Sequence, residues 1–177
     1  MATPSWPGDG MDIYTVNGLP LHVLLVHVVV ILLPVTAICV LLAAIWPAVR
    51  RRLGIVIALM GLVIIGLIPL TTQAGQWLKD RVAGTPLIEA HATLGNALWP
   101  WSLSLGILAI VTWLWYFVTE RRDRRRAPHA KARRTVGVVI ALLAISIGGV
   151  ATYQTVLVGD SGSRAIWQNS FSDTPLK

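Results

Sequence analysis

Four long stretches of apolar residues dominate the sequence and predict helices that span a membrane. They cover residues 20–49, 53–78, 86–119 and 135–159, and Glu89 is the only charged residue within them. Each stretch exceeds the roughly 20 residues that an α-helix needs to cross about 30 Å of hydrocarbon. Segments of this length satisfy their own backbone hydrogen bonds in lipid as helices. We therefore predict an all-α polytopic membrane protein, a four-transmembrane-helix bundle.

Composition supports a single membrane domain over residues 1–177. Hydrophobic residues make up 55% of the chain and charged residues only 13%, whereas soluble domains carry roughly 25% charged residues. No room remains for a large soluble domain beside the apolar stretches. After the fourth stretch, Gly159 predicts a turn, and residues 160–177 are expected to form a short amphipathic tail at the outer surface.

Basic residues predict the orientation in the membrane. Eleven of the fifteen Lys and Arg residues lie in the first and third connections, including Arg50, Arg51 and Arg52. By the positive-inside rule, these connections face the cytoplasm, and both termini and the second connection face outward. Basic clusters also occur in nucleic-acid-binding proteins, but here we expect a topology signal assisted by anionic lipids at the Arg-rich inner loop, and no nucleic-acid partner.

Hydrogen-bonding side chains concentrate near the outer ends of the four predicted helices, and the inner halves contain nothing comparable. His27 lies about 10 Å along its helix from Pro20, and His91 about 8 Å from Pro86. Polar groups within a membrane often mark a site, although they also join helices without further function. The other polar candidates at this depth are Thr71, Thr72, Gln73, Tyr153 and Gln154.

His27 and His91 are the pair predicted to hold a cofactor. Imidazoles on facing helices bind haem iron between two axial nitrogens in helical bundles. We expect one haem b in the outer layer, with Gly95, one turn after His91, leaving room for the flat ring. His22 lies about 140° around the helix from His27. It would point sideways and could support the site or gate a proton.

Other kinds of site remain open. A quinone pocket requires only an apolar slot, a histidine and one or two hydroxyls or amides. A three-histidine copper or zinc site has an unfavourable helical phase and no carboxylate. The sequence contains no Gly-rich phosphate loop, CxxC pair or serine nucleophile motif, so hydrolase chemistry has no support and no catalytic residue is predicted.

Four short motifs in order resemble one bacterial membrane family. They are HVLLVH at 22–27, PLTTQAGQW at 69–77, EAHATLG at 89–95 and GDSGSRAIW at 159–167. Together they are similar to the family called domain of unknown function 2231, in its actinobacterial branch. The first motif looks like the family's HPxxVH opening, with Val23 in place of the proline. The last motif often reads GHSGA in relatives, and Asp160 here replaces that histidine.

The resemblance implies a four-helix inner-membrane protein, and some relatives appear fused to Rieske or cytochrome c modules. That context suggests respiratory redox work near the outer face, with haem b or quinone bound in the histidine layer and respiratory-chain subunits as partners. The alternative is a non-catalytic accessory subunit in which the same layer only joins helices. A small transporter has the least support, since no acidic residue lies in the membrane core and no inverted repeat is apparent.

Overall fold

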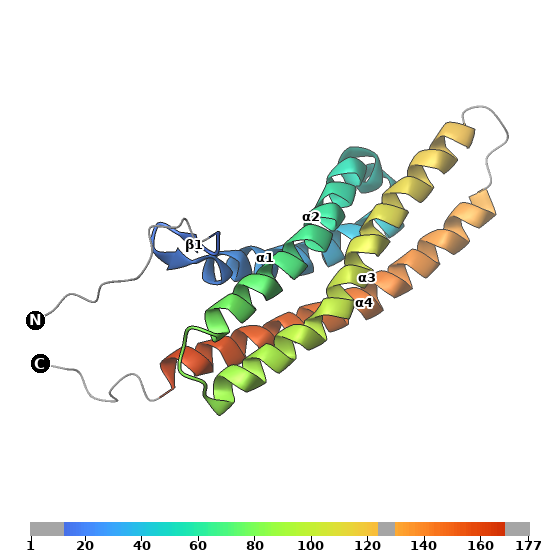
Figure 1. Cartoon of the computed structure of the whole chain (residues 1–177). Helices are drawn as coiled ribbons and strands as arrows, with labels where there is room; N and C mark the ends of the chain where they lie inside the picture. Colours follow the sequence, from blue (N-terminus) through green and yellow to red (C-terminus); the bar gives the residue numbers. More distant parts are fainter. Residues whose placement is uncertain (1–12, 124–129, 169–177) are drawn as a thin grey trace, which may run out of the picture.

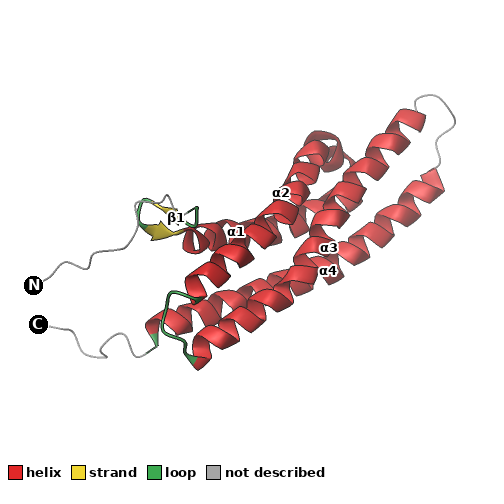
Figure 2. Cartoon of the chain, in the orientation of Figure 1, coloured by secondary structure: helices red, strands yellow, loops and turns green. Residues whose placement is uncertain are grey.

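Four long helices form the protein in the computed structural model, which describes residues 13–123 and 130–168. The helices are α1 (Leu21–Ile45), α2 (Pro47–Lys79), α3 (Pro86–Asp123) and α4 (Ala130–Trp167) (Figures 1 and 2). All four are long and apolar enough to cross a membrane. Large apolar side chains such as Ile31, Ile38 and Leu142 point outward from the bundle, as lipid contact requires. The predicted four-helix membrane fold is confirmed.

The helices pack in a ring. Each contacts the next along the chain, α4 closes the ring against α1, and α1 also touches α3 across the centre. The α2–α3 connection and the last turns of α4 lie at one end, together with the start of α1 (Figure 1). We call this the histidine end, after His22 and His91. The opposite end, where α2 begins with Arg50, Arg51 and Arg52, is the arginine end.

The boundary between α1 and α2 differs from the prediction. The first helix was expected to continue to residue 49, with a connection at the three arginines, but α1 ends at Ile45 and α2 begins at Pro47. Proline has no N–H and clashes with the preceding turn, so it stops one helix but suits the first position of another. Trp46, forced into an extended conformation by the proline that follows it, has φ −119° and ψ 108°. The arginines therefore belong to the first turns of α2.

The turn predicted after Gly159 is also wrong, because α4 continues without interruption to Trp167. Two local contacts favour helix over the low propensity of glycine. Arg164 forms an ion pair of 2.8 Å with Asp160, one turn earlier, and Ser163 donates a hydrogen bond to the Gly159 carbonyl. Residues 160–167, expected to belong to a separate surface tail, are thus the last two turns of α4. The rest of that tail, 169–177, lies outside the described residues.

A short β-hairpin precedes α1 and was not predicted. Its strands are β1 (Thr15–Val16) and β2 (Leu19–Pro20), paired antiparallel. Asn17 and Gly18 form the turn with φ values of 50° and 77°, which Asn-Gly tolerates better than most dipeptides. The Leu21 N–H donates to the Tyr14 carbonyl over 2.7 Å, so the hairpin satisfies one of the free donors at the start of α1.

Glycines allow two pairs of helices to approach closely. A Cβ at Gly61 would lie 2.5 Å from the Gly106 carbonyl oxygen, and one at Gly148 would lie 2.5 Å from the Ala37 Cβ. Membrane helix interfaces prefer small residues, so the sequence predicts such contacts at Gly61, Gly66, Gly148 and Gly149. The prediction is confirmed for Gly61 and Gly148. It is wrong for Gly66 and Gly149, where nothing lies within 4 Å.

We predict that Gly61→Ala destabilises the bundle by about 1–3 kcal/mol, the usual cost of overpacking a well-packed interface. The added methyl group meets a backbone carbonyl, which cannot rotate away, so α2 and α3 must separate. Unfolding of the purified protein in mixed micelles, followed by circular dichroism, measures the change. Gly66→Ala on the same helix is the matched control and should not destabilise the protein. Equal stability of both variants would contradict the close α2–α3 contact.

Candidate functional site

His22 links α1 to α2 at the histidine end. It is in phase with Val29, Leu33 and Thr36, which form the buried face of α1. Its Nδ1 lies 2.9 Å from the Thr71 carbonyl oxygen of α2. A Cβ at Gly75, one turn after Thr71, would lie 2.9 Å from the same nitrogen. The imidazole thus fits against bare backbone and is fixed by a carbonyl of the neighbouring helix.

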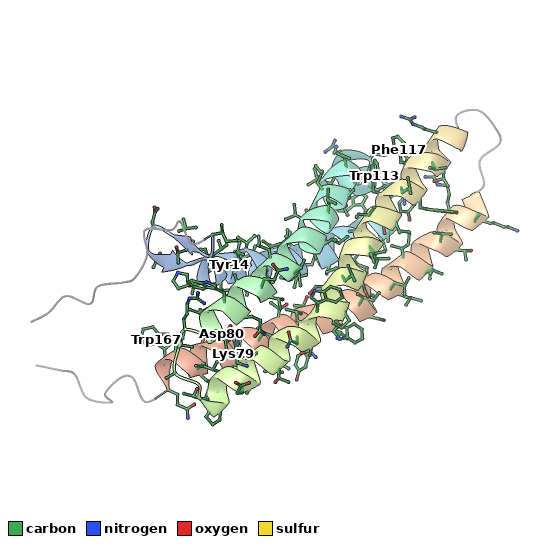
Figure 3. The ribbon with its side chains drawn as sticks, in the orientation of Figure 1. Tyr14, Lys79, Asp80, Trp113, Phe117 and Trp167 are labelled. Carbon is green, nitrogen blue, oxygen red and sulfur yellow. The ribbon has the colours of Figure 1, made fainter. Side chains whose placement is uncertain are left out.

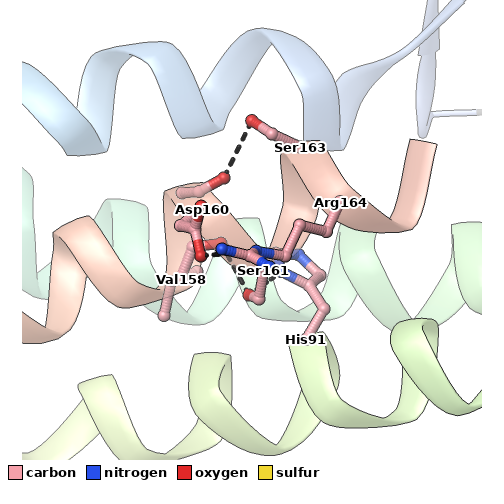
Figure 4. Close-up of polar contacts among 7 residues, drawn as sticks. His91, Val158, Asp160, Ser161, Ser163 and Arg164 are labelled. Carbon is pink, nitrogen blue, oxygen red and sulfur yellow. Dashed lines mark hydrogen bonds and ion pairs between the residues drawn. The ribbon is translucent and has the colours of Figure 1, made fainter. Parts of the chain in front are cut away.

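His91 links α3 to α4 in the same manner. Its Nδ1 lies 3.2 Å from the Val158 carbonyl oxygen and 3.0 Å from the Ser161 Oγ (Figure 4). A Cβ at Gly162, one turn after Val158, would lie 3.0 Å from the His91 Cε1. Each helical hairpin therefore contains the same unit: a histidine, a carbonyl on the following helix, and a glycine four residues beyond that carbonyl.

The two imidazoles meet where the hairpins come together. Their ring centroids are 6.1 Å apart, and the ring planes are inclined at 78°. Both side chains are half-buried. Gln154, one turn before Val158 on α4, has a buried Oε1 without a hydrogen-bond partner. Two imidazoles and one unsatisfied amide oxygen therefore occupy this end of the bundle.

The partners of the two rings determine where the proton lies on each neutral imidazole. A carbonyl oxygen only accepts, so the His22 Nδ1 must donate to Thr71. The Ser161 hydroxyl donates to the Val158 carbonyl over 2.8 Å. Because the only hydrogen of this hydroxyl is directed at Val158, the Ser161 oxygen can only accept from His91. The His91 Nδ1 must therefore also carry a proton and donate it. In the neutral rings, both Nε2 atoms then carry a lone pair, which is the form in which imidazole binds metal.

His27 does not take part in this arrangement, and the predicted pairing of His27 with His91 across the bundle is wrong. His27 is exposed on the outside of α1, and its Nδ1 lies 2.6 Å from the Val23 carbonyl of its own helix. It is in phase with Ile31, Val35 and Ile38, which all face outward. The five-residue spacing predicted that only one histidine of α1 faces inward, and the structure assigns that position to His22.

The other candidate residues are only partly gathered at the site. Thr72 is half-buried, and its hydroxyl donates to the Ile68 carbonyl of its own helix. Gln73 and Tyr153 are exposed at the bundle surface, which contradicts their expected place in a pocket. Nothing lies within 4 Å of a Cβ at Gly95. The glycines against the imidazoles are Gly75 and Gly162, which sequence analysis did not select.

Aromatic and charged residues cover the histidine end. The Tyr14 and Trp77 rings are 5.8 Å apart, and Figure 3 shows Tyr14 on the hairpin side of the bundle. The Arg81 guanidinium lies 4.1 Å from the Trp77 ring centroid. Lys79 at the end of α2 bonds Glu89 near the start of α3 over 2.8 Å. These contacts join the hairpin region to α2, and α2 to α3, at the histidine end.

With this geometry established, comparison with known proteins identifies a family. A family model described as "Predicted membrane protein (DUF2231)" matches residues 18–175. The chain belongs to the DUF2231 family. No curated protein and no solved structure matches it. The DUF2231 description supports a membrane protein, and the matched region includes both histidine–carbonyl–glycine units.

We predict that His22→Ala lowers the free energy of unfolding by roughly 1 kcal/mol, the scale of a hydrogen bond between membrane helices. His27→Ala on the same helix should leave stability nearly unchanged, because its bond stays within one turn of α1. Unfolding in mixed micelles compares the two variants under identical conditions. A larger loss for His27→Ala would contradict the inward position of His22.

Proposed function

We propose that this DUF2231 protein binds one haem b at its histidine end, where His22 and His91 would hold the iron, and serves a respiratory redox role. One observation carries the proposal: both histidines donate Nδ1–H to a main-chain carbonyl. A metal-binding histidine commonly donates its other nitrogen in this way, which fixes the ring and increases the basicity of the ligand atom. The two such rings lie on helices from opposite halves of the bundle.

The donor set favours haem over a bare metal ion. Among the described residues, no group of three or more His, Cys, Asp or Glu side chains could hold a metal ion. Structural zinc sites take four protein ligands and catalytic sites usually three. Haem needs only two protein ligands because its macrocycle supplies the rest. A bound haem would supply one-electron transfer.

The surroundings of the pair are compatible with this role. Gly75 and Gly162 hold the rings against backbone, so small rotations of the imidazoles are restricted. Gln154 contributes a buried oxygen that no described protein group satisfies. Quinone has less support, since its carbonyl oxygens need hydrogen-bond donors, whereas each Nε2 is an acceptor when Nδ1 carries the proton.

A structural role is the second candidate, favoured by a different aspect of the same contacts. Each histidine already forms a complete link between two consecutive helices through its Nδ1 bond and its glycine contact. An accessory subunit of a larger membrane complex could use these links only to hold its helices together. The two candidates differ in whether the Nε2 atoms bind anything.

We predict a sharp α-band in the reduced-minus-oxidised spectrum of protein expressed with haem supplied and purified in detergent. His22→Ala and His91→Ala should each abolish the band, while His27→Ala should retain it. Circular dichroism of each variant checks that the helices persist. A wild-type protein that stays colourless and shows no spectral shift on haem addition would reject haem binding. Loss of the band only in His27→Ala would reject the proposed ligands.

The orientation proposed with this function puts the arginine end in the cytoplasm and the histidine end at the outer face of the plasma membrane. Support comes from Arg50, Arg51 and Arg52 in the first turns of α2, since basic residues beside membrane helices are retained on the cytoplasmic side. A redox centre at the histidine end would then be near the outer surface.

We predict that alkaline phosphatase fused after Lys177 is active in intact bacterial cells, because the enzyme folds only outside the cytoplasm. Green fluorescent protein fused at the same position should remain dark when the fusion is exported through the general secretion pathway. The opposite pattern of activity and fluorescence would reverse the orientation.

A further inference from the structure

We propose that the arginine end contains a discrete site for the phosphate group of an anionic phospholipid. A cavity of about 320 Å³ lies there, within the range of small-molecule sites. It lies mainly between α2 and α3, and the residues that define its chemistry are Arg50, Arg51, Arg52, Thr112, Trp113 and Phe117. Trp113 and Phe117 are labelled on α3 in Figure 3, far from Tyr14 at the histidine end.

Arg50 supplies a buried cation with an unused donor. Its side chain is 11% exposed, and its guanidinium lies 4.4 Å from the Tyr116 ring centroid. Its Nε is buried without a hydrogen bond. The Glu120 carboxylate is 3.9 Å from this nitrogen, too far for a hydrogen bond, and is also 3.9 Å from the Arg133 guanidinium. A ligand oxygen could satisfy the donor that Glu120 does not reach.

Thr112, another residue that lines the cavity, contains a second unused polar group. The other buried serine and threonine hydroxyls in the described helices donate to the carbonyl one turn earlier, as Thr36, Thr155 and Ser102 do. Thr112 is equally buried, at 1% exposure, yet its Oγ1 has no partner. A buried hydroxyl without a hydrogen bond is costly. Thr112 and Arg50 line the same cavity, and one acceptor bound there would satisfy both.

The charge and shape of the cavity indicate the class of ligand. The lining contains three arginines and one carboxylate, that of Glu120, so its net charge attracts an anion. Arg51 and Arg52 are exposed at its rim, where a headgroup could enter. Trp113 and Phe117 stack with centroids 5.2 Å apart and provide an apolar wall. A phospholipid would use both parts, its phosphate on the arginines and its glycerol and acyl region on the aromatic wall. Inorganic phosphate would contact only the arginines.

The test measures the melting temperature of the full-length detergent-purified protein during titration with phosphatidylglycerol, phosphatidylcholine or inorganic phosphate. A ligand that binds only the folded state raises the melting temperature with concentration. We expect phosphatidylglycerol to do so at far lower concentration than the other two. Equal effects of both lipids would overturn the proposal. Saturation by inorganic phosphate at the same concentration would overturn it in favour of a free anion.

Two variants test the residues. Thr112→Val keeps the shape and removes a buried hydroxyl that has no hydrogen bond within the described protein, so the unliganded protein should melt at the same temperature as the wild type or higher. Its affinity for phosphatidylglycerol should fall about tenfold, the scale of one hydrogen bond to a charged group. Arg50→Gln should weaken binding at least as much. Thr155→Val is the matched control, whose hydroxyl bonds within α4, and should bind as the wild type does. Unchanged affinity in Thr112→Val and Arg50→Gln would overturn the site.

Discussion

The absence of water inside a bilayer is the constraint on which this structure depends. Every polar side chain within the spans needs a partner from the protein or a ligand. Most serine and threonine hydroxyls meet this need by donating to the preceding turn of their own helix. His22 and His91 instead bond the carbonyls of neighbouring helices. The hydrogen bonds that satisfy these two rings therefore also join α1 to α2 and α3 to α4.

Because polar groups need partners inside a bilayer, the buried polar atoms that have none are informative. Buried polar atoms without partners are Gln154 Oε1 at the histidine end, and Arg50 Nε and Thr112 Oγ1 at the arginine end, among the residues that the structure describes. His91 and Thr112 lie on one buried stripe of α3 and are separated by about 30 Å at 1.5 Å per residue. That distance matches the hydrocarbon thickness of a membrane. The two proposed sites therefore correspond to its two faces.

The sequence predicted the number of helices and their approximate spans, because length and hydropathy determine these. It could not predict which face of α1 is buried, since the helix is apolar on every side and lacks an amphipathic pattern. The choice between His22 and His27 therefore failed. A usable signal was present: His22 is in phase with the small residues Thr36 and Ala44, and small residues mark helix contacts in membranes.

Other failures have local causes. The stop at Pro47 and the Asn17–Gly18 turn follow rules of backbone geometry that hydropathy does not detect. The continuation of α4 beyond Gly159 is supported by the local contacts of Asp160 with Arg164 and of Gly159 with Ser163. Contacts of Ser161 and Gly162 with His91 on α3 add to them. The sequence also predicted an inner half without notable polar groups. Thr112 was overlooked because a single threonine in an apolar helix stands out only when its missing hydrogen bond is seen.

The one-residue connection at Trp46 has a consequence for the biosynthesis of the protein. Because α1 ends at Ile45 and α2 begins at Pro47, the adjoining helix ends can be separated by no more than about 7–8 Å of chain. The first helix cannot diffuse away in the lipid while the second is still being translated. We therefore expect the two to leave the insertion machinery as a preformed hairpin.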